Sequence, residues 1–279
     1  MILKDILPPL EPISLLLIGA MDIGAQDSIV QRLENYDIRV IGFEPNPVEY
    51  EKLIATNQDP RIRYFPFAIG DGETHLFHIT NTGMTSSLFV PNLKVLDQYQ
   101  SLGELCQVVD VDLIETKRLD DLSELAGVDY IGIDVQGAEL MALSNAEKLL
   151  KEVGIIQTEV EFVELYKKQP LFAEVDQECR RQGFQFHKFL LISGKTLNSL
   201  VAGNNLCEVC SQMLWADAVY IKDLMNLETL ESGKLLKMAV ILHEVYASKD
   251  VCHFVLSCYD QRHGTALALG YRSKILGIK

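Results

Sequence analysis

Short apolar runs alternate with amphipathic stretches from the N-terminus to Lys222. Runs rich in Val, Ile and Leu predict buried strands, and stretches with apolar residues three and four positions apart predict helices. This alternation is typical of a doubly wound, mostly parallel sheet, which is an α/β fold with helices on both faces. The core strands are predicted at residues 14–21, 38–44, 62–69, 128–135 and 153–162, and the helices at 29–36, 47–57, 138–150 and 172–183.

Four other apolar runs predict additions to this sheet. Residues 74–79 and 106–115 have the pattern of an antiparallel strand pair, a β-hairpin elaboration. Residues 184–192 and 217–222 supply two more strands. Within residues 106–115, Asp110 and Asp112 alternate with apolar residues.

The alternation ends after Lys222, where two helical stretches with wide apolar faces follow at 234–248 and 251–262. They bring no strands of their own. We therefore predict one Rossmann-like domain over residues 1–223 and a helical C-terminal extension over residues 224–279. The extension is expected to act either as a lid or as an association surface through which the chain forms homo-oligomers.

Composition and charge narrow the class of partner. The chain has 279 residues, of which 48% are hydrophobic and 23% charged, and its formal net charge is −14. An excess of negative charge argues against nucleic acid or an anionic membrane as the main partner. Acidic and proline residues, among them Asp5 and Pro12, interrupt the apolar N-terminal stretch, whereas a signal or spanning segment needs a longer clean run. We expect a cytoplasmic protein without membrane insertion.

The six cysteines are expected to be reduced thiols, because no export signal is predicted. Cys207 and Cys210 have the spacing of metal ligands, but no second such pair completes a tetrahedral zinc site. We therefore predict no metal site.

Carboxylates follow the predicted core strands. Ligands of open parallel sheets bind beyond the carboxyl ends of the strands. Asp22, Glu44, Asp134 and the pair Glu159 and Glu161 all lie at such ends. Since a carboxylate is costly to bury without a partner, their convergence predicts a ligand site at this edge.

The stretch after the first strand, "DIGAQDS", supplies small residues whose N–H groups let a ligand approach closely. It does not match Gly-x-Gly-x-x-Gly, which disfavours a nicotinamide dinucleotide. Glu44 follows Gly24 by about 20 residues, the separation at which an acidic residue reaches ribose hydroxyls. The alternative is that Glu44 only faces the dipole of the helix after Pro47.

An ordered set of motifs resembles the FkbM family of S-adenosylmethionine-dependent methyltransferases. The motifs are "DIGAQDS", "GFEPNPVEYEKL", "FAIGDGE", "NTGMTSSL", "KRLDDL", "IDVQGAEL" and "EVEFVELY". The resemblance runs from about residue 14 to 190, and residues 212–223 look like the closing strand of that family. It implies a seven-stranded Rossmann-like sheet with the last strand antiparallel. It also implies S-adenosylmethionine as cofactor and a hydroxyl on a sugar, glycolipid or polyketide-like molecule as methyl acceptor.

Matched motif by motif, the resemblance also implies site residues. Glu44 would bind the ribose diol, and the stiff turn of Pro45 and Asn46 would aim it. Phe67 and Ala68 would border the adenine. Asp134 and Gln136 would face the sulfonium and the acceptor. The methionine part of the cofactor would lie against the first loop, which contains Asp22, Gly24, Ala25 and Gln26.

Two positions depart from the family pattern. Asp27 and Ser28 stand where the family usually has glycine, although both side chains are able to form local hydrogen bonds. Gly132 stands where the family usually has lysine. These departures keep a second hypothesis open, in which the chain is a non-catalytic binding or assembly protein that retains the fold.

The transfer of a methyl group to a hydroxyl needs a base to take up the hydroxyl proton. The candidates are Asp134, Glu159 and Glu161, and strand alternation puts the last two on one face. His78, which precedes the Gly/Ser/Thr-rich "NTGMTSSL", is a further candidate. The leading hypothesis is an O-methyltransferase. The alternatives are the non-catalytic protein and a nicotinamide-dependent oxidoreductase.

Overall fold

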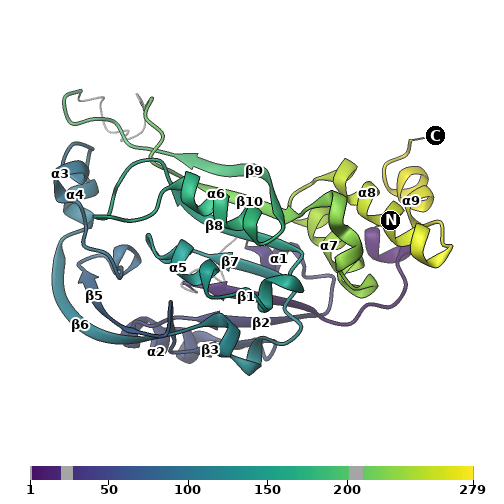
Figure 1. Ribbon diagram of the computed structural model, residues 1–279, viewed down its shortest axis with the longest axis horizontal. Helices are drawn as coiled ribbons and strands as arrows, with labels where there is room; N and C mark the ends of the chain where they lie inside the picture. The colour runs from purple at the N-terminus through teal and green to yellow at the C-terminus, as the bar shows by residue number, and fades with distance from the viewer. Residues whose placement is uncertain (1, 20–27, 201–209, 279) are drawn as a thin grey trace.

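A computed structural model describes residues 2–19, 28–200 and 210–278. Within them, seven strands form one sheet in the order β3-β2-β1-β7-β8-β10-β9 (Figure 1). The strands of this sheet are β1 (Ile13–Ile18), β2 (Ile38–Phe43), β3 (Ile62–Phe65), β7 (Tyr130–Ile133), β8 (Ile155–Glu161), β9 (Phe184–Ser193) and β10 (Trp215–Lys222).

The last strand, β10, runs antiparallel to both of its neighbours, whereas β3, β2, β1, β7 and β8 are parallel. This is the Rossmann-like, mostly parallel sheet that the sequence predicts, including the antiparallel closing strand. The carboxyl ends of the parallel strands therefore meet at one edge. That edge carries the site described below.

Helices cover both faces of the sheet (Figure 1). α5 and α6 lie over one face, and α7 lies over the other together with the short α1. The helices in the described residues are α1 (Ile29–Arg32), α2 (Pro47–Thr56), α3 (Leu93–Leu96), α4 (Leu102–Leu105), α5 (Glu139–Ser144), α6 (Phe172–Arg181), α7 (Ser232–Glu244), α8 (Lys249–His263) and α9 (Leu267–Gly270).

Strand alternation divides the core between these two layers. On β8, Ile156 and Val160 pack with α5 and α6, while Ile155 points to the opposite face and packs with α7. All of these side chains are fully buried. Because α7 covers the sheet directly, the C-terminal helices share a hydrophobic core with β1, β7 and β10. Their roles as a lid or an association surface stay predictions, as does the division into 1–223 and 224–279.

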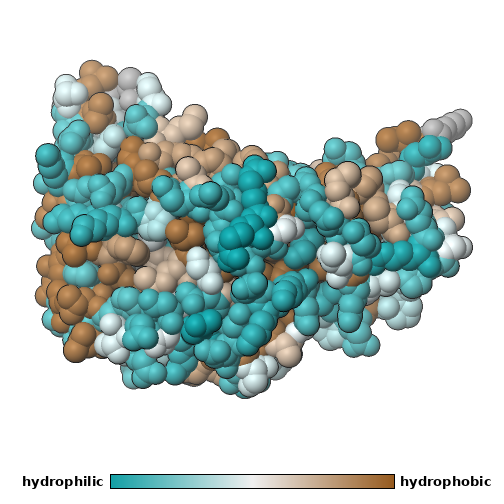
Figure 2. Space-filling model, viewed as in Figure 1, coloured by the Kyte–Doolittle hydropathy of each residue, from teal (hydrophilic) through white to brown (hydrophobic). Residues whose placement is uncertain are grey.

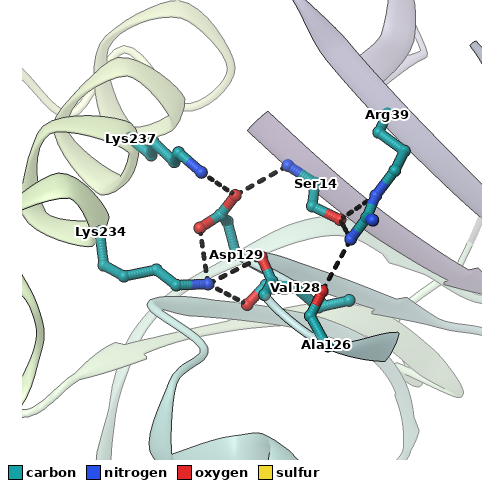
Figure 3. Close-up of polar contacts among 8 residues, drawn as sticks. Ser14, Arg39, Ala126, Val128, Asp129, Lys234 and Lys237 are labelled. Carbon is teal, nitrogen blue, oxygen red and sulfur yellow. Dashed lines mark hydrogen bonds and ion pairs between the residues drawn. The ribbon is translucent and has the colours of Figure 1, made fainter. Parts of the chain in front are cut away.

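A buried ionic cluster fastens α7 to the sheet (Figure 3). Asp129, which is 3% exposed, precedes β7 and accepts a 2.7 Å hydrogen bond from the backbone N–H of Ser14 on β1. Lys234 and Lys237 from α7 reach the same carboxylate at 2.9 and 3.0 Å. A buried carboxylate is tolerable only when it is paired in this way. The cluster thus ties two central strands to a helix about 100 residues away in sequence.

A second sheet of three strands, in the order β4-β6-β5, stands beside the first. Its strands are β4 (Ala68–Ile69), β5 (Thr74–Thr80) and β6 (Val108–Lys117). β5 and β6 pair antiparallel, as predicted. Several apolar side chains of this pair, such as Val109 and Leu113, are exposed. Figure 2 shows hydrophobic surface at the left edge of the molecule, the side on which β5 and β6 lie in Figure 1.

Two predicted elements are divided in the structure. The strand expected at 62–69 ends at Phe65, and Ala68 starts β4 in the other sheet. Pro66 lies between them and has no N–H to continue a strand ladder. The helix expected at 138–150 stops at Ser144, and a short 3-10 turn, Leu149–Lys151, follows. None of the helices in the described residues is long and apolar enough to cross a membrane.

Candidate functional site

A cavity of about 420 Å³ opens at the carboxyl edge of the large sheet. The ends of β1, β2, β7 and β8 form its floor, and the connection between β5 and β6, residues 81–107, forms a wall and roof. Polar residues from four strand ends reach it, namely Gly19, Glu44, Asp134, Gln136, Glu159 and Glu161. The convergence of carboxylates expected from the sequence is therefore present at this edge.

Glu44 is held rigidly at the end of β2. Its Oε1 accepts a 2.8 Å hydrogen bond from the N–H of Asn46. Asn46 in turn caps α2, because its side-chain oxygen accepts from the N–H of Val48 at 3.0 Å, and Pro47 occupies the first helical position. Glu44 is 4% exposed, and burial raises the pKa of its carboxyl group. Its Oε2 has no hydrogen-bond partner within the described residues, so this oxygen is available to a ligand.

Aromatic rings lie next to Glu44. Phe43, Phe65 and Phe67 form a cluster with ring centroids 5.5–5.9 Å apart, and Phe67 and Ala68 line the cavity. On the opposite side, Gly19 has φ of +80°, and a Cβ there would overlap the backbone carbonyl of Asp134. A buried acid beside an aromatic wall and a bare backbone fits an adenosine group, with hydroxyls for the acid and a flat base for the rings.

A hydrogen-bond network crosses the cavity at the ends of β7 and β8. The Gln136 amide donates to Asp134 Oδ1 at 2.6 Å and to Glu159 Oε2 at 2.9 Å, and it accepts from the Tyr166 hydroxyl at 2.9 Å. Gln136 has φ of +54°, a region that non-glycine residues rarely occupy. The backbone carbonyl of Gln136 also accepts from Ser87 at 2.6 Å. The network holds the two carboxylates at a fixed separation.

Burial and mutual repulsion change the acidity of the other carboxyl groups. Burial raises the pKa of Glu159 and of Glu161 well above the ordinary value, and the charge of Asp134 adds to both effects. The pKa of the buried Glu139 is raised to about 7, mainly by burial, although it accepts hydrogen bonds from the N–H groups of Val135 and Gly137. A raised pKa makes the carboxylate form of such a group a stronger acceptor of a hydroxyl proton.

Asp217 on β10 extends this acidic group. It lies opposite Glu159 in the β8–β10 ladder and accepts a 3.0 Å hydrogen bond from Gln157. Burial and the charge of Asp134 raise the pKa of Asp217 to about 6. Sequence analysis did not single out Asp217, because only the antiparallel pairing of β10 with β8 brings it beside Glu159.

Three of the carboxylates are close enough to share a cation. One oxygen each from Asp134, Glu139 and Glu159 lies within 4.8 Å of the others. The sequence predicts no metal site, and that expectation remains a prediction. Cys210 is exposed, and its partner in the motif, Cys207, lies outside the described residues.

The first loop cannot be compared with its expected role, because Asp22, Gly24, Ala25, Gln26 and Asp27 lie outside the described residues. Ser28 is described and caps α1, with its Oγ 3.3 Å from the N–H of Gln31. His78 is buried on β5, where its backbone pairs with Ser87, and it does not line the cavity.

Tyr166 is the other residue that sequence reasoning missed. It is 3% exposed, lines the cavity and donates to Gln136. Burial is the main cause that raises the pKa of its hydroxyl, so the group stays a donor at neutral pH. A signal existed, since Tyr166 ends the motif "EVEFVELY". The sequence does not show, however, that the chain turns back toward β7 there.

Comparison with known proteins gives a family match. The model of the family described as "Methyltransferase FkbM domain" matches residues 18–186, which include the ends of β1, β2, β7 and β8. A curated protein described as "2-O-methyltransferase NoeI", from Sinorhizobium fredii (strain NBRC 101917 / NGR234), is 33% identical over 144 residues. That alignment spans 48% of this chain and 58% of the relative.

Solved structures of methyltransferases are also similar to the chain. Methyltransferase FkbM from Methylobacillus flagellatus KT is 14% identical, with 78% of this chain and 45% of that one covered and a TM-score of 0.42. Magnesium protoporphyrin IX methyltransferase (ChlM) from Synechocystis PCC 6803, solved with bound SAM, is 8% identical, with 76% and 71% covered and a TM-score of 0.37.

Proposed function

Since the chain belongs to the FkbM family of S-adenosylmethionine-dependent methyltransferases, we propose that it methylates a hydroxyl oxygen of a small molecule or glycan. The observation that carries the proposal is Glu44. It is a buried carboxylate at the end of β2, with one oxygen held by Asn46 and the other without a hydrogen-bond partner among residues 2–19, 28–200 and 210–278. A ribose diol supplies the two hydroxyl donors that such a carboxylate accepts.

The proposed cofactor contacts follow the cavity from Glu44 to Asp134. Glu44 binds the ribose, Pro45 and Asn46 fix its direction, and Phe67 and Ala68 border the adenine. Asp134 and Gln136 border the reacting end of the cofactor. When bound, S-adenosylmethionine supplies an electrophilic methyl group on a positively charged sulfur. The carboxylates of this edge stabilise positive charge there.

We assign the role of general base to Glu159. Its Oε2 is fixed by the Gln136 amide, its pKa is raised by burial, and it is less enclosed than the 2% exposed Glu161. A carboxylate so placed takes the proton of the acceptor hydroxyl as the new O–C bond forms. Holding the acceptor in line contributes up to about 7–11 kcal/mol in favourable models, and the base adds about 10²–10⁴-fold in rate.

The choice of oxygen as the methylated atom has one further support. The relative from Sinorhizobium fredii is described as a 2-O-methyltransferase, and a third of the aligned residues are identical to this chain. Raised carboxyl pKa values also suit a hydroxyl, which must lose a proton during the reaction, better than a thiolate, which is already deprotonated.

Calorimetry with the full chain tests the proposal. S-adenosylhomocysteine is expected to bind with one site per chain, NAD is expected not to bind, and Glu44→Gln should weaken the first interaction. An acceptor screen with radiolabelled S-adenosylmethionine then tests turnover. A folded protein that does not bind S-adenosylhomocysteine would refute the proposal. Binding without methylation of any acceptor would favour the non-catalytic alternative.

A further inference from the structure

One part of the cavity lining takes no part in the proposed cofactor contacts, and we call this part the cap pocket. The connection between β5 and β6 builds most of it, and Trp215 from β10 closes one side. Its lining side chains are almost all apolar: Met84, Leu88, Leu96, Leu102, Leu105 and Trp215.

The hydroxyl groups near the cap pocket already have partners within the protein. The Thr85 hydroxyl lies 2.9 Å from the carbonyl oxygen of Leu105, to which it donates. Ser86 Oγ accepts from the N–H of Thr80 at 3.1 Å. The Tyr166 hydroxyl donates to Gln136 at 2.9 Å. These hydrogen bonds hold the connection in place.

Lys195 also lines this part of the cavity and interacts with another group of the protein. The other charged side chains among the described lining residues all lie at the strand ends: Glu44, Asp134, Glu159 and Glu161. A molecule in the cavity meets a polar strip at the sheet and an apolar wall elsewhere. A sugar ring would leave several hydroxyls facing Leu and Met side chains, and each unpaired hydroxyl weakens binding.

We propose that the acceptor carries its reacting hydroxyl on an apolar carbon frame, alicyclic or aromatic, and that this frame fills the cap pocket. The inference rests on the proposed function and narrows its substrate class. The hydroxyl lies at the carboxylate strip beside Glu159, while the frame packs against Leu96, Leu102 and Leu105. Burial of the frame supplies binding free energy in proportion to its apolar area.

Leu105 is the residue best suited to a test of this preference. It lines the pocket yet is 40% exposed, so a polar replacement does not bury a charge in the core. The carbonyl of Leu105, which accepts from Thr85, is unaffected by a side-chain change. Leu113, 74% exposed on β6 and outside the cavity, is a matched control.

The experiment measures binding to the full chain saturated with S-adenosylhomocysteine. The probes are 4-cyclohexylcyclohexanol and trehalose, each of which has two six-membered rings, the first with one hydroxyl and the second with many. We expect the bicyclic alcohol to bind at least tenfold more tightly than trehalose. Leu105→Asp should lower the affinity for the alcohol about tenfold, as expected for a polar group placed in an apolar pocket. Leu113→Asp should leave its affinity unchanged.

Each outcome is decisive. Tighter binding of trehalose, or equal affinities of Leu105→Asp and Leu113→Asp for the alcohol, would overturn the inference while S-adenosylhomocysteine binding leaves the proposed function intact. Failure of the wild-type chain to bind S-adenosylhomocysteine would overturn the proposed function and this inference with it. The affinity of Leu105→Asp for S-adenosylhomocysteine, unchanged from wild type, shows that the variant is folded.

Discussion

The carboxylate of Glu44 accepts a 2.8 Å hydrogen bond from the backbone N–H of Asn46, two residues further along the chain. The turn between them leads directly into α2, so the same residues that start a helix also aim the acid into the cavity. The turn after this apolar strand therefore meets two requirements. It caps α2, and it fixes the direction of the Glu44 carboxylate.

Replacing this carboxylate should weaken cofactor binding. We expect Glu44→Gln to lower the affinity for S-adenosylhomocysteine by tenfold or more, because a hydrogen bond to a charged group contributes about 1.5–3 kcal/mol. Isothermal calorimetry measures the change. Glu49→Gln, on the adjoining helix and paired with the exposed Lys52, is the control and should bind normally. Equal losses in the two variants would contradict the role of Glu44.

Alanine substitutions at two glycines distinguish the cost of a steric overlap from the cost of backbone strain. Gly19 and Gly127 have almost the same φ, +80° and +79°, but a Cβ at Gly19 would overlap the carbonyl of Asp134 whereas one at Gly127 meets nothing within 4 Å. We expect Gly127→Ala to cost about 1–2 kcal/mol of unfolding free energy from strain alone. Gly19→Ala should cost clearly more and also weaken S-adenosylhomocysteine binding. Urea denaturation and calorimetry check both, and equal costs would show that the approach to Asp134 is relaxed.

Protonation of Asp217 should stabilise the folded state at acidic pH. Asp217 has an ordinary pKa near 3.8 in the unfolded chain and about 6 in the structure, so the folded state binds its proton more tightly. The stability from this protonation is fully present below about pH 4 and is lost as pH rises through about 6. Asp217→Asn should therefore raise the melting temperature at pH 8 by about 2–4 °C and leave it nearly unchanged at pH 4.

Scanning calorimetry at both pH values measures the Asp217 effect. Asp112→Asn, an exposed change on β6, serves as its control and should alter the melting temperature equally at the two pH values. A fall in the melting temperature of Asp217→Asn at pH 8 would show that the hydrogen bond from Gln157 outweighs the repulsion from Asp134.

The ionic cluster at Asp129 should carry much of the attachment of α7. We expect Asp129→Asn to lower the unfolding free energy by about 3–5 kcal/mol, because Lys234 and Lys237 are then left partly buried without a counter-charge. Asp121→Asn, which removes an exposed pair with Arg118, is expected to have a much smaller effect. Urea unfolding of the two variants measures the contrast. Similar values would mean that Asp129 is solvated in solution.

Kinetics distinguish the three candidate bases. We expect Glu159→Gln to lower kcat about 10²-fold or more without a matching change in S-adenosylhomocysteine affinity, since the base acts on the acceptor proton. Asp134→Asn and Glu161→Gln should lower kcat less. The comparison uses single-turnover rates with an acceptor found by screening. Full activity of Glu159→Gln would move the role to one of the other two carboxylates.

Periodicity in the sequence was enough to predict the sheet, because each core strand is a continuous apolar run with a helix after it. Residues at the carboxyl ends of parallel strands lie at one edge of the sheet, and for this reason the sequence identified Glu44, Asp134, Glu159 and Glu161 as site residues. In the structure all four line one cavity. Pro66 was the exception. It lies inside a run that appears continuous in hydrophobicity, and its missing N–H divides the run between two sheets.

Residues brought to the site by tertiary contacts were not predictable in the same way. Tyr166 reaches Gln136 across 30 positions, and Asp217 meets Glu159 only through antiparallel pairing. The raised pKa values at Glu139 and Glu159 likewise depend on how deeply the folded chain encloses them. Sequence patterns predict which face of a helix or strand is buried and where the element ends. How deeply a side chain is buried, and which residues of a neighbouring strand it meets, depend on tertiary packing.

The connection between β5 and β6 leaves and re-enters the fold through two strands that pair with each other over seven residue pairs, with one register shift between Ile79 and Thr80. Its length and sequence can vary without disturbing the turn at Glu44, provided that the hydrogen bond from Ser87 to the Gln136 carbonyl is kept. Under the role that we propose for the cap pocket, a change of acceptor needs substitutions only within residues 81–107 and leaves the proposed cofactor contacts at Glu44 as they are. Grafting residues 81–107 between members of the family would move acceptor preference with the segment.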